Sequence, residues 1–279
     1  MDTPSASNSC DLAARFVESA LLASTSESRA LRREVIAIGE LARALPGDGA
    51  FHSFASSVLQ KMNEHARGAA RTEDGSFENS LYRAFDHLDW ILGLDYASDE
   101  TMSRDPKCVE RVYENAGAGV QSSYATVLLA LELAKSQEGA KWIDLGSGFG
   151  RVGLVIGLLR PDIQFVGYEF VSHRVTASEI AAARAGVSGS VSFKTQDLSE
   201  KAFAIPVADV YYMWDPFTRE TYIHVLEQIR GYGRDRAVTI LARGAAANWV
   251  NDVMKDEPHW AAERTHDGGN LAIFRSRVA

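Results

Sequence analysis

The sequence predicts an α/β protein with a doubly wound, mostly parallel sheet that ends in an antiparallel hairpin, preceded by an all-helical N-terminal domain. Three observations predict this fold. Short apolar runs of strand length alternate with helical patterns from residue 141 onward, and such alternation is typical of a parallel sheet covered by helices on both faces. The last two apolar runs have no helix between them. Residues 1–110 show helical patterns and almost no strand pattern.

The N-terminal region, residues 1–110, carries apolar residues at the three-and-four spacing of amphipathic helices. We expect four helices, with a Pro–Gly breaker at 46–49, the last two helices over 51–66 and 77–94, and a polar loop over 65–76. The expected inward-facing residues are Leu12, Phe16, Ala20, Leu21, Leu31, Val35, Ile38, Leu41, Leu45, Phe54, Val58, Met62, Leu81, Phe85, Leu88 and Ile91. We interpret residues 1–110 as a helical accessory or substrate-recognition domain.

The second domain, residues 111–279, follows a shift in composition after Pro106 and opens with a helix over 120–135. The expected strands are 141–145, 164–169, 191–195, 208–214 and 237–241, and the expected helices are 150–159, 172–185, 217–229 and 245–254. The runs 259–265 and 271–275 form the hairpin. Their connection at 266–270 contains Asp-Gly and Gly-Gly, which supply the positive φ angles of a tight turn.

Composition limits the classes of function. The net charge of −8 disfavours nucleic acid as a partner, because general DNA and RNA binders usually carry a basic stripe. It is compatible with a basic protein or a small molecule. Two cysteines and seven histidines fit no metal or redox spacing, so no metal site is expected. Neither a secretory signal nor an apolar run of about 20 residues is visible, so we expect a cytoplasmic protein without a membrane segment.

A glycine-rich loop over 144–153 follows the first expected strand and opens a helix. Glycines there allow a sharp turn and the close approach of a ligand. Backbone N–H groups at the helix start could receive a polar or anionic ligand group. Because Gly148, Gly150 and Gly153 also match the dinucleotide fingerprint, the loop alone leaves a nicotinamide cofactor open.

Three acidic residues at strand ends favour a different ligand. Asp144 ends the first strand, where its charge would repel a pyrophosphate and attract an ammonium or sulfonium. Glu169 ends the second strand, where an acid can accept both hydroxyls of a ribose. Asp197 follows the third strand and could accept a hydrogen bond from an adenine amino group. Since parallel strands end at one edge of a sheet, we expect the three acids around one crevice.

The segment 142–153, together with Glu169 and Asp197, resembles the class I S-adenosylmethionine-dependent methyltransferases, which have a Rossmann-like fold. The resemblance covers roughly residue 120 to the end of the chain, and the hairpin is similar to that family's inserted antiparallel strand. It implies S-adenosyl-L-methionine as cofactor, with the methionine part near Asp144, the ribose on Glu169 and the adenine on Asp197. The expected cofactor-binding residues are Asp144, Gly146, Ser147, Gly148, Gly150, Glu169, Asp197 and Ser122.

The methyl acceptor is expected at the end of the fourth strand, over 211–217. Strand alternation places Tyr212 and Trp214 on one side of the sheet, where aromatic faces can attract a cation. Asp215 could orient an amine or accept its proton, although Asp215 and Pro216 also fit a plain helix start. Family members that methylate nitrogen often carry Asn/Asp-Pro-Pro-aromatic here, and this chain lacks the second proline. The expected catalytic residues are Asp215, Tyr212, Trp214 and Phe217.

A second resemblance, confined to the glycine loop, is to lysine methyltransferases of the disruptor-of-telomeric-silencing type. Those enzymes carry a helix before the first strand, and the loop that leads into this helix touches the cofactor. The corresponding segments are 113–115 and 121–124, which include Ser122, and they also fit a simple helix entry capped by a serine.

The sequence therefore predicts a methyltransferase that modifies nitrogen in a protein lysine or a small-molecule amine. One alternative is a nicotinamide-dependent oxidoreductase, although no Tyr-x-x-x-Lys run is present. Another is a non-catalytic cofactor-binding protein with the same fold.

Overall fold

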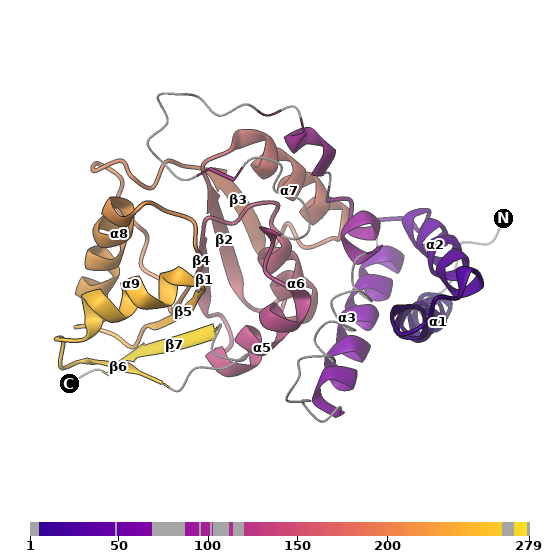
Figure 1. The fold of residues 1–279 in the computed structure, drawn as a ribbon, viewed down its shortest axis with the longest axis horizontal. Helices are drawn as coiled ribbons and strands as arrows, with labels where there is room; N and C mark the ends of the chain where they lie inside the picture. The colour runs from indigo at the N-terminus through magenta and orange to yellow at the C-terminus, as the bar shows by residue number, and fades with distance from the viewer. Residues whose placement is uncertain are drawn as a thin grey trace.

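The computed structural model describes residues 6–47, 49–68, 87–94, 96–100, 102, 112–113, 120–263 and 271–277. Within these residues, seven strands form one sheet in the order β3-β2-β1-β4-β5-β7-β6 (Figure 1). The strands are β1 (Lys141–Leu145), β2 (Gln164–Glu169), β3 (Val191–Thr195), β4 (Val210–Trp214), β5 (Thr239–Arg243), β6 (Trp260–Ala262) and β7 (Leu271–Ser276). Strands β1 to β5 pair in parallel, whereas β7 pairs antiparallel with β5 and β6. The predicted Rossmann-like doubly wound sheet with its closing hairpin is confirmed.

The chain reverses its direction of travel across the sheet at β1. From β1 the sheet grows through β2 to β3 on one side, and the chain then crosses back to place β4 on the other side of β1. In open α/β sheets, ligands bind outside the carboxyl ends of the strands at such a reversal. The fold therefore points to the carboxyl ends of β1 and β4 as the place for a ligand.

Helices cover both faces of the sheet (Figure 1). They are α5 (Tyr124–Ala134), α6 (Arg151–Leu159) and α7 (Ser172–Arg184) on one face, and α8 (Arg219–Tyr232) and α9 (Ala245–Met254) on the other. Because side chains alternate along a strand, Tyr212 packs in the first core, whereas Tyr211 and Met213 pack in the second. The predicted orientation of the fourth strand is confirmed.

The N-terminal helices are α1 (Ala6–Ser24), α2 (Arg29–Arg43) and α3 (Ala50–Gly68), and residues 87–92 are helical as well. Helix α3 lies against the helices of the first face (Figure 1), where the Ser56 hydroxyl donates to the Leu158 carbonyl at 3.0 Å. Side chains of α1, α2 and α3 belong to the same continuous core as those of α6. The helical region is therefore packed onto the sheet domain, and its predicted role as a separate domain stays a prediction.

Some expected boundaries and faces are wrong. Helix α3 reaches Gly68, so the loop does not begin at residue 65, because Glu64, Ala66 and Arg67 are good helix formers. Leu41 is 57% exposed, because α2 turns Val35, Ile38, Gly39 and Ala42 inward instead. Two later helices start after the positions expected, α5 at residue 124 and α8 at residue 219.

Several expected elements lie outside the described residues. They are the loop at 69–76, the first part of the fourth helix with Leu81 and Phe85, residues 114 and 115, the domain boundary near 110 and the hairpin turn at 266–270. In the parts of the chain that the structure describes, no helix is long and apolar enough to cross a bilayer. Those same parts contain no group of three or more His, Cys, Asp or Glu residues arranged to hold a metal ion.

Gly150 provides a test of the packing beneath the glycine loop. Its φ angle is 81°, and a Cβ there would lie 2.7 Å from both the Ser178 hydroxyl oxygen and a Phe193 ring carbon. We expect Gly150→Ala to lower the free energy of unfolding by about 2–4 kcal/mol. The alanine would strain the backbone at a left-handed φ angle, and its Cβ would overpack the space beside Ser178 and Phe193. Urea denaturation measures the change. Gly189→Ala, whose Cβ would meet nothing within 4 Å, is the control, and an equally small effect in both variants would contradict the prediction.

Candidate active site

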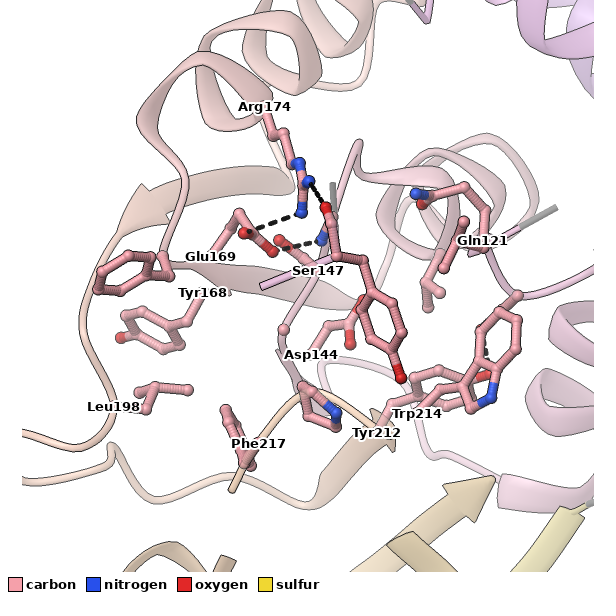
Figure 2. Close-up of a pocket in the computed structure, with 18 of the residues that line it drawn as sticks. Gln121, Asp144, Ser147, Tyr168, Glu169, Arg174, Leu198, Tyr212, Trp214 and Phe217 are labelled. Carbon is pink, nitrogen blue, oxygen red and sulfur yellow. Dashed lines mark hydrogen bonds and ion pairs between the residues drawn. The ribbon is translucent and has the colours of Figure 1, made fainter. Parts of the chain in front are cut away.

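A cavity with an empty volume of about 890 Å³, including its opening to solvent, lies at the carboxyl ends of β1, β2 and β4. Asp144, Glu169 and Asp197 all line it, so the structure brings the three acids together as the strand-end argument requires. Figure 2 shows Asp144 and Glu169 at the cavity. The other predicted site residues that line the cavity are Ser122, Gly146, Ser147, Gly148, Tyr212, Trp214 and Phe217. Gly150 and Asp215 are not among the lining residues.

The backbone amides of the glycine loop already have acceptors. Gly146, Ser147 and Gly148 follow β1, and the amides of Gly146 and Ser147 both donate to the Tyr168 carbonyl at 2.9 Å. The Gly148 amide donates to Oε2 of Glu169 at 2.9 Å. These three amides are therefore not free to receive an anionic ligand group. The expectation that amides at the start of α6 (Arg151–Leu159) bind a ligand group stays a prediction. A pyrophosphate at this position would also meet the Glu169 carboxylate, whose charge repels it.

Asp144 is a buried carboxylate that faces the cavity (Figure 2). It is 2% exposed, and no described residue donates a hydrogen bond to its carboxylate. Burial raises the pKa of Asp144 well above the ordinary value for aspartate, and the negative charge of Glu169 raises it further. Because a buried charge without a partner is destabilising, a cationic ligand group at Asp144 would bind with a large electrostatic gain.

Glu169 is held from three directions. Its Oε2 accepts the Gly148 amide, its Oε1 accepts the Val171 amide at 3.0 Å, and Nη1 of Arg174 lies 3.7 Å from Oε1 (Figure 2). Burial raises the pKa of Glu169, and the positive charge of Arg174 opposes that rise. A carboxylate offers about four lone-pair positions, so each oxygen keeps room for one further donor. Glu169 can therefore accept two neighbouring hydroxyls of one ligand.

Asp197 begins a turn at the far side of the cavity. Its Oδ1 accepts hydrogen bonds from the Ser199 amide at 2.8 Å and from the Ser199 hydroxyl at 2.6 Å. Leu198, Tyr168 and Phe170 line the cavity near it, and they give this end an apolar surface. A flat aromatic base with one polar edge fits this end of the cavity. The apolar side chains can cover the faces of its rings, while the Asp197 carboxylate accepts a hydrogen bond from its amino group.

The end of β4 forms an aromatic wall of the cavity. The Tyr212 hydroxyl lies 2.7 Å from the Ser122 hydroxyl, which fixes the buried ring (Figure 2). Trp214 lines the cavity and carries the guanidinium of Arg243 against its ring at 4.4 Å from the ring centroid. Phe217 also lines the cavity, but it packs in the second core with Tyr168 and Leu198 rather than beside Tyr212 and Trp214.

Asp215 and Gly150 contribute to the folded structure near the cavity rather than to its lining. Asp215 has a φ angle of 44°, and its Oδ1 accepts the Ala246 amide at 2.8 Å, so it caps the first turn of α9. The positive end of that helix attracts the carboxylate away from the cavity. This position gives no support to a role of Asp215 as a proton acceptor. The alternative that Asp215 caps the next helix in the chain, α8, is wrong, because Thr218 is the N-cap residue of α8. Gly150 allows close packing of α6 on Phe193.

Two buried aspartate–arginine pairs that the sequence interpretation missed connect the N-terminal region to the cavity. In the first, Nε of Arg151 donates to Oδ1 of Asp89 at 3.0 Å, and the hydroxyls of Tyr96 and Tyr124 donate to the same carboxylate at 2.7 and 2.6 Å. Nη1 of Arg151 also donates to the Ser122 carbonyl at 2.8 Å. This pair therefore positions the segment that holds Tyr212.

The second pair joins Arg174 to Asp99. Nε and Nη2 of Arg174 donate to Oδ1 and Oδ2 of Asp99 at 3.1 and 2.7 Å, and Nη2 also donates to the Tyr113 carbonyl. Nε2 of His173 contacts the same carboxylate. One signal in the sequence could have indicated such pairs, because Asp89 interrupts an apolar stripe between Leu88 and Ile91.

Comparisons with known proteins give structural likenesses only. No protein-family model and no curated protein matches the sequence. The chain is similar to an S-adenosylmethionine-dependent O-methyltransferase from Thermotoga maritima, with 14% identity, a TM-score of 0.44, and coverage of 57% of this chain and 67% of that chain. It is similar to an RNA methyltransferase from Salinibacter ruber in complex with S-adenosyl-L-homocysteine, with 23% identity, a TM-score of 0.42, and coverage of 54% and 88%.

A third similar structure is precorrin-6y C5,15-methyltransferase from Geobacter metallireducens, with 10% identity, a TM-score of 0.45, and coverage of 57% and 90%. All three are methyltransferases, the class that the glycine loop resembles, and their names describe different acceptors. Our expectation that nucleic acid is disfavoured stays a prediction. The resemblance to the disruptor-of-telomeric-silencing type stays a prediction.

Asp144 gives a stability prediction that does not depend on any ligand. Because its pKa is raised on folding, its contribution to stability is present near pH 4 and is lost as the pH rises through the raised pKa. Asp144→Asn should therefore stabilise the ligand-free protein by about 1–3 kcal/mol at pH 8 and weaken the loss of stability between pH 5 and pH 8. Thermal and urea unfolding across this range measure both effects.

Asp162→Asn is the matched control with the opposite sign. Arg160 lowers the pKa of Asp162 through a hydrogen bond, so the stability it contributes is present above its ordinary pKa. We expect this variant to lose up to about 1 kcal/mol at pH 8. A destabilised Asp144→Asn protein would mean that Asp144 has a partner in the ligand-free fold.

Proposed function

We propose that the chain is an S-adenosylmethionine-dependent methyltransferase whose cofactor occupies the cavity at the ends of β1, β2 and β4. The observation that carries the proposal is Asp144, a buried carboxylate that has no hydrogen-bond partner among the described residues. It lies beside a glycine loop in which the amides of Gly146, Ser147 and Gly148 are already bonded. Such a site attracts a cationic nucleoside and repels the pyrophosphate of a nicotinamide dinucleotide. Glu169 and Asp197 line the same cavity, which supports the assignment.

Each part of this cofactor has a counterpart in the cavity. Asp144 would bind the ammonium group and lies where a sulfonium is also stabilised. Gln121, which is 8% exposed and borders Gly148, would donate to the carboxylate of the methionine part. Glu169 would accept the two ribose hydroxyls, and Asp197 would accept from the adenine amino group.

The cofactor supplies an activated methyl group, and the protein positions the acceptor in line with it and keeps water out. Tyr212 and Trp214 line the cavity at the end of β4, where the acceptor would enter, and Phe217 lines it beside Tyr168 and Leu198. The aromatic faces of Tyr212 and Trp214 can attract a positive charge by about 0.5–2 kcal/mol. Such a charge develops on the nitrogen of an amine as it takes the methyl group, which favours an amine, from a protein lysine or a small molecule, as the acceptor. Because Asp215 caps α9, this mechanism assigns it no proton transfer, and the amine reacts in its neutral form.

Calorimetric titration tests the cofactor. We expect S-adenosylmethionine and S-adenosylhomocysteine to bind, and Asp144→Asn to weaken both by at least about tenfold, because a charge-assisted hydrogen bond is lost. Since binding favours ionised Asp144, the affinity should rise with pH through the raised pKa, and binding should release protons. The control Asp162→Asn should bind as the wild type does. Binding of NAD without binding of S-adenosylmethionine would overturn the proposal.

Trp214→Ala tests the acceptor wall. We expect cofactor affinity to change by less than about threefold while turnover falls by about 100-fold, because the variant loses acceptor positioning only. Trp249→Leu, which alters a tryptophan of α9 that does not line the cavity, is the control. Incubation of lysate fractions with methyl-labelled cofactor identifies the acceptor. Label in nucleic acid would contradict the amine and leave the methyltransferase proposal standing.

A further inference from the structure

We propose that Arg174 is a positioning residue that orients Glu169 for the hydroxyls of the cofactor ribose, and that Asp99 holds Arg174 in place for this task. The inference rests on the proposed function, because it takes Glu169 as the ribose acceptor. It adds a residue pair that the glycine-loop resemblance does not include, and it gives the N-terminal region a part in cofactor selection.

The contacts of Arg174 leave one edge of its guanidinium for Glu169. The residue is 5% exposed and lies in the first turn of α7. Its Nε and Nη2 are bound by the two carboxylate oxygens of Asp99, and Nη2 also donates to the Tyr113 carbonyl. Because a guanidinium is a rigid planar fork, fixing two of its nitrogens determines the position of the third. That third nitrogen, Nη1, faces Glu169 (Figure 2).

The distance between Arg174 and Glu169 suits positioning rather than direct bonding. Nη1 lies 3.7 Å from Oε1 of Glu169, which is longer than a hydrogen bond. Arg174 therefore lends a positive charge to the carboxylate without occupying one of its lone pairs. The amides of Gly148 and Val171 take one lone pair of each oxygen. The remaining lone pair of each oxygen stays available for a pair of neighbouring hydroxyls.

Asp99 belongs to the short helix η1 (Tyr96–Asp99), far from Arg174 in the sequence. The Asp99 side chain is 1% exposed and that of Arg174 is 6% exposed, so the pair is shielded from water. The pair of Asp89 with Arg151 has comparable burial, at 4% for each side chain, but Arg151 reaches the Ser122 carbonyl and not Glu169. The fold thus contains a matched pair that can serve as an internal control.

The test compares two ligands, S-adenosylhomocysteine and its analogue without the 2′- and 3′-hydroxyls, by calorimetric titration. The variants are Arg174→Lys and the neutral double variant Asp99→Asn with Arg174→Gln, which avoids leaving an unpaired buried charge. We expect each variant to bind S-adenosylhomocysteine about 10- to 50-fold more weakly than the wild type, as when a hydrogen bond to a charged group is impaired. The affinity for the analogue should change by less than about twofold. Arg174→Lys keeps the charge but not the fork, so it should lose less than the double variant.

The control variants are Arg151→Lys and the double variant Asp89→Asn with Arg151→Gln. Any loss they show should be the same for both ligands. An equal loss for both ligands in the Arg174 variants would overturn the positioning role and leave a purely structural one. If the wild type binds neither ligand, the proposed function itself is wrong. If one of the two Arg174 variants does not unfold cooperatively, the ligand comparison is made with the other one. The two variants differ in kind, because Arg174→Lys keeps both buried charges and the double variant removes both.

Discussion

The hydrogen bond from the Gly148 amide to the Glu169 carboxylate joins the ends of β1 and β2, and the geometry of the cavity depends on it. It gives the glycine loop its shape together with the Tyr168 carbonyl, which accepts from the two preceding amides. Because of this bond, the Gly148 amide holds the Glu169 carboxylate in place instead of donating to a ligand. Without that acid the Gly148 amide would be free, and the electrostatic choice between a phosphate and a cation would be open.

The buried charges of this protein fall into two groups with different consequences. Asp89 and Asp99 are each matched by an arginine and by further donors, which compensates the loss of hydration. Among the residues that the structure describes, Asp144 has no such compensation, and burial raises its pKa. An uncompensated acid beside buried acids that have partners is the pattern of a site that a ligand completes, because stability is given up where binding is needed.

The N-terminal helices contribute to the crevice as well as to the core. Their side chains share one core with α6, and their two acids reach the first turns of α6 and α7, which flank the cavity. An accessory role for this region, as expected from the sequence, is compatible with these contacts. The contacts add a more specific role, because they place Arg151 and Arg174 and through them Ser122 and Glu169.

The sequence by itself determined the strands, the crossover helices, the closing hairpin and the positions of Asp144, Glu169 and Asp197 at strand ends. Apolar periodicity and glycine spacing are local signals, and the rule that parallel strands end at one edge turns them into a shared crevice. Only the tertiary structure decided where each polar group points. It turned Asp215 toward α9, gave the loop amides to Tyr168 and Glu169, and paired Asp89 and Asp99 with arginines 62 and 75 positions away. Such partners leave no periodic trace in the chain, because their proximity arises only when separate elements pack together.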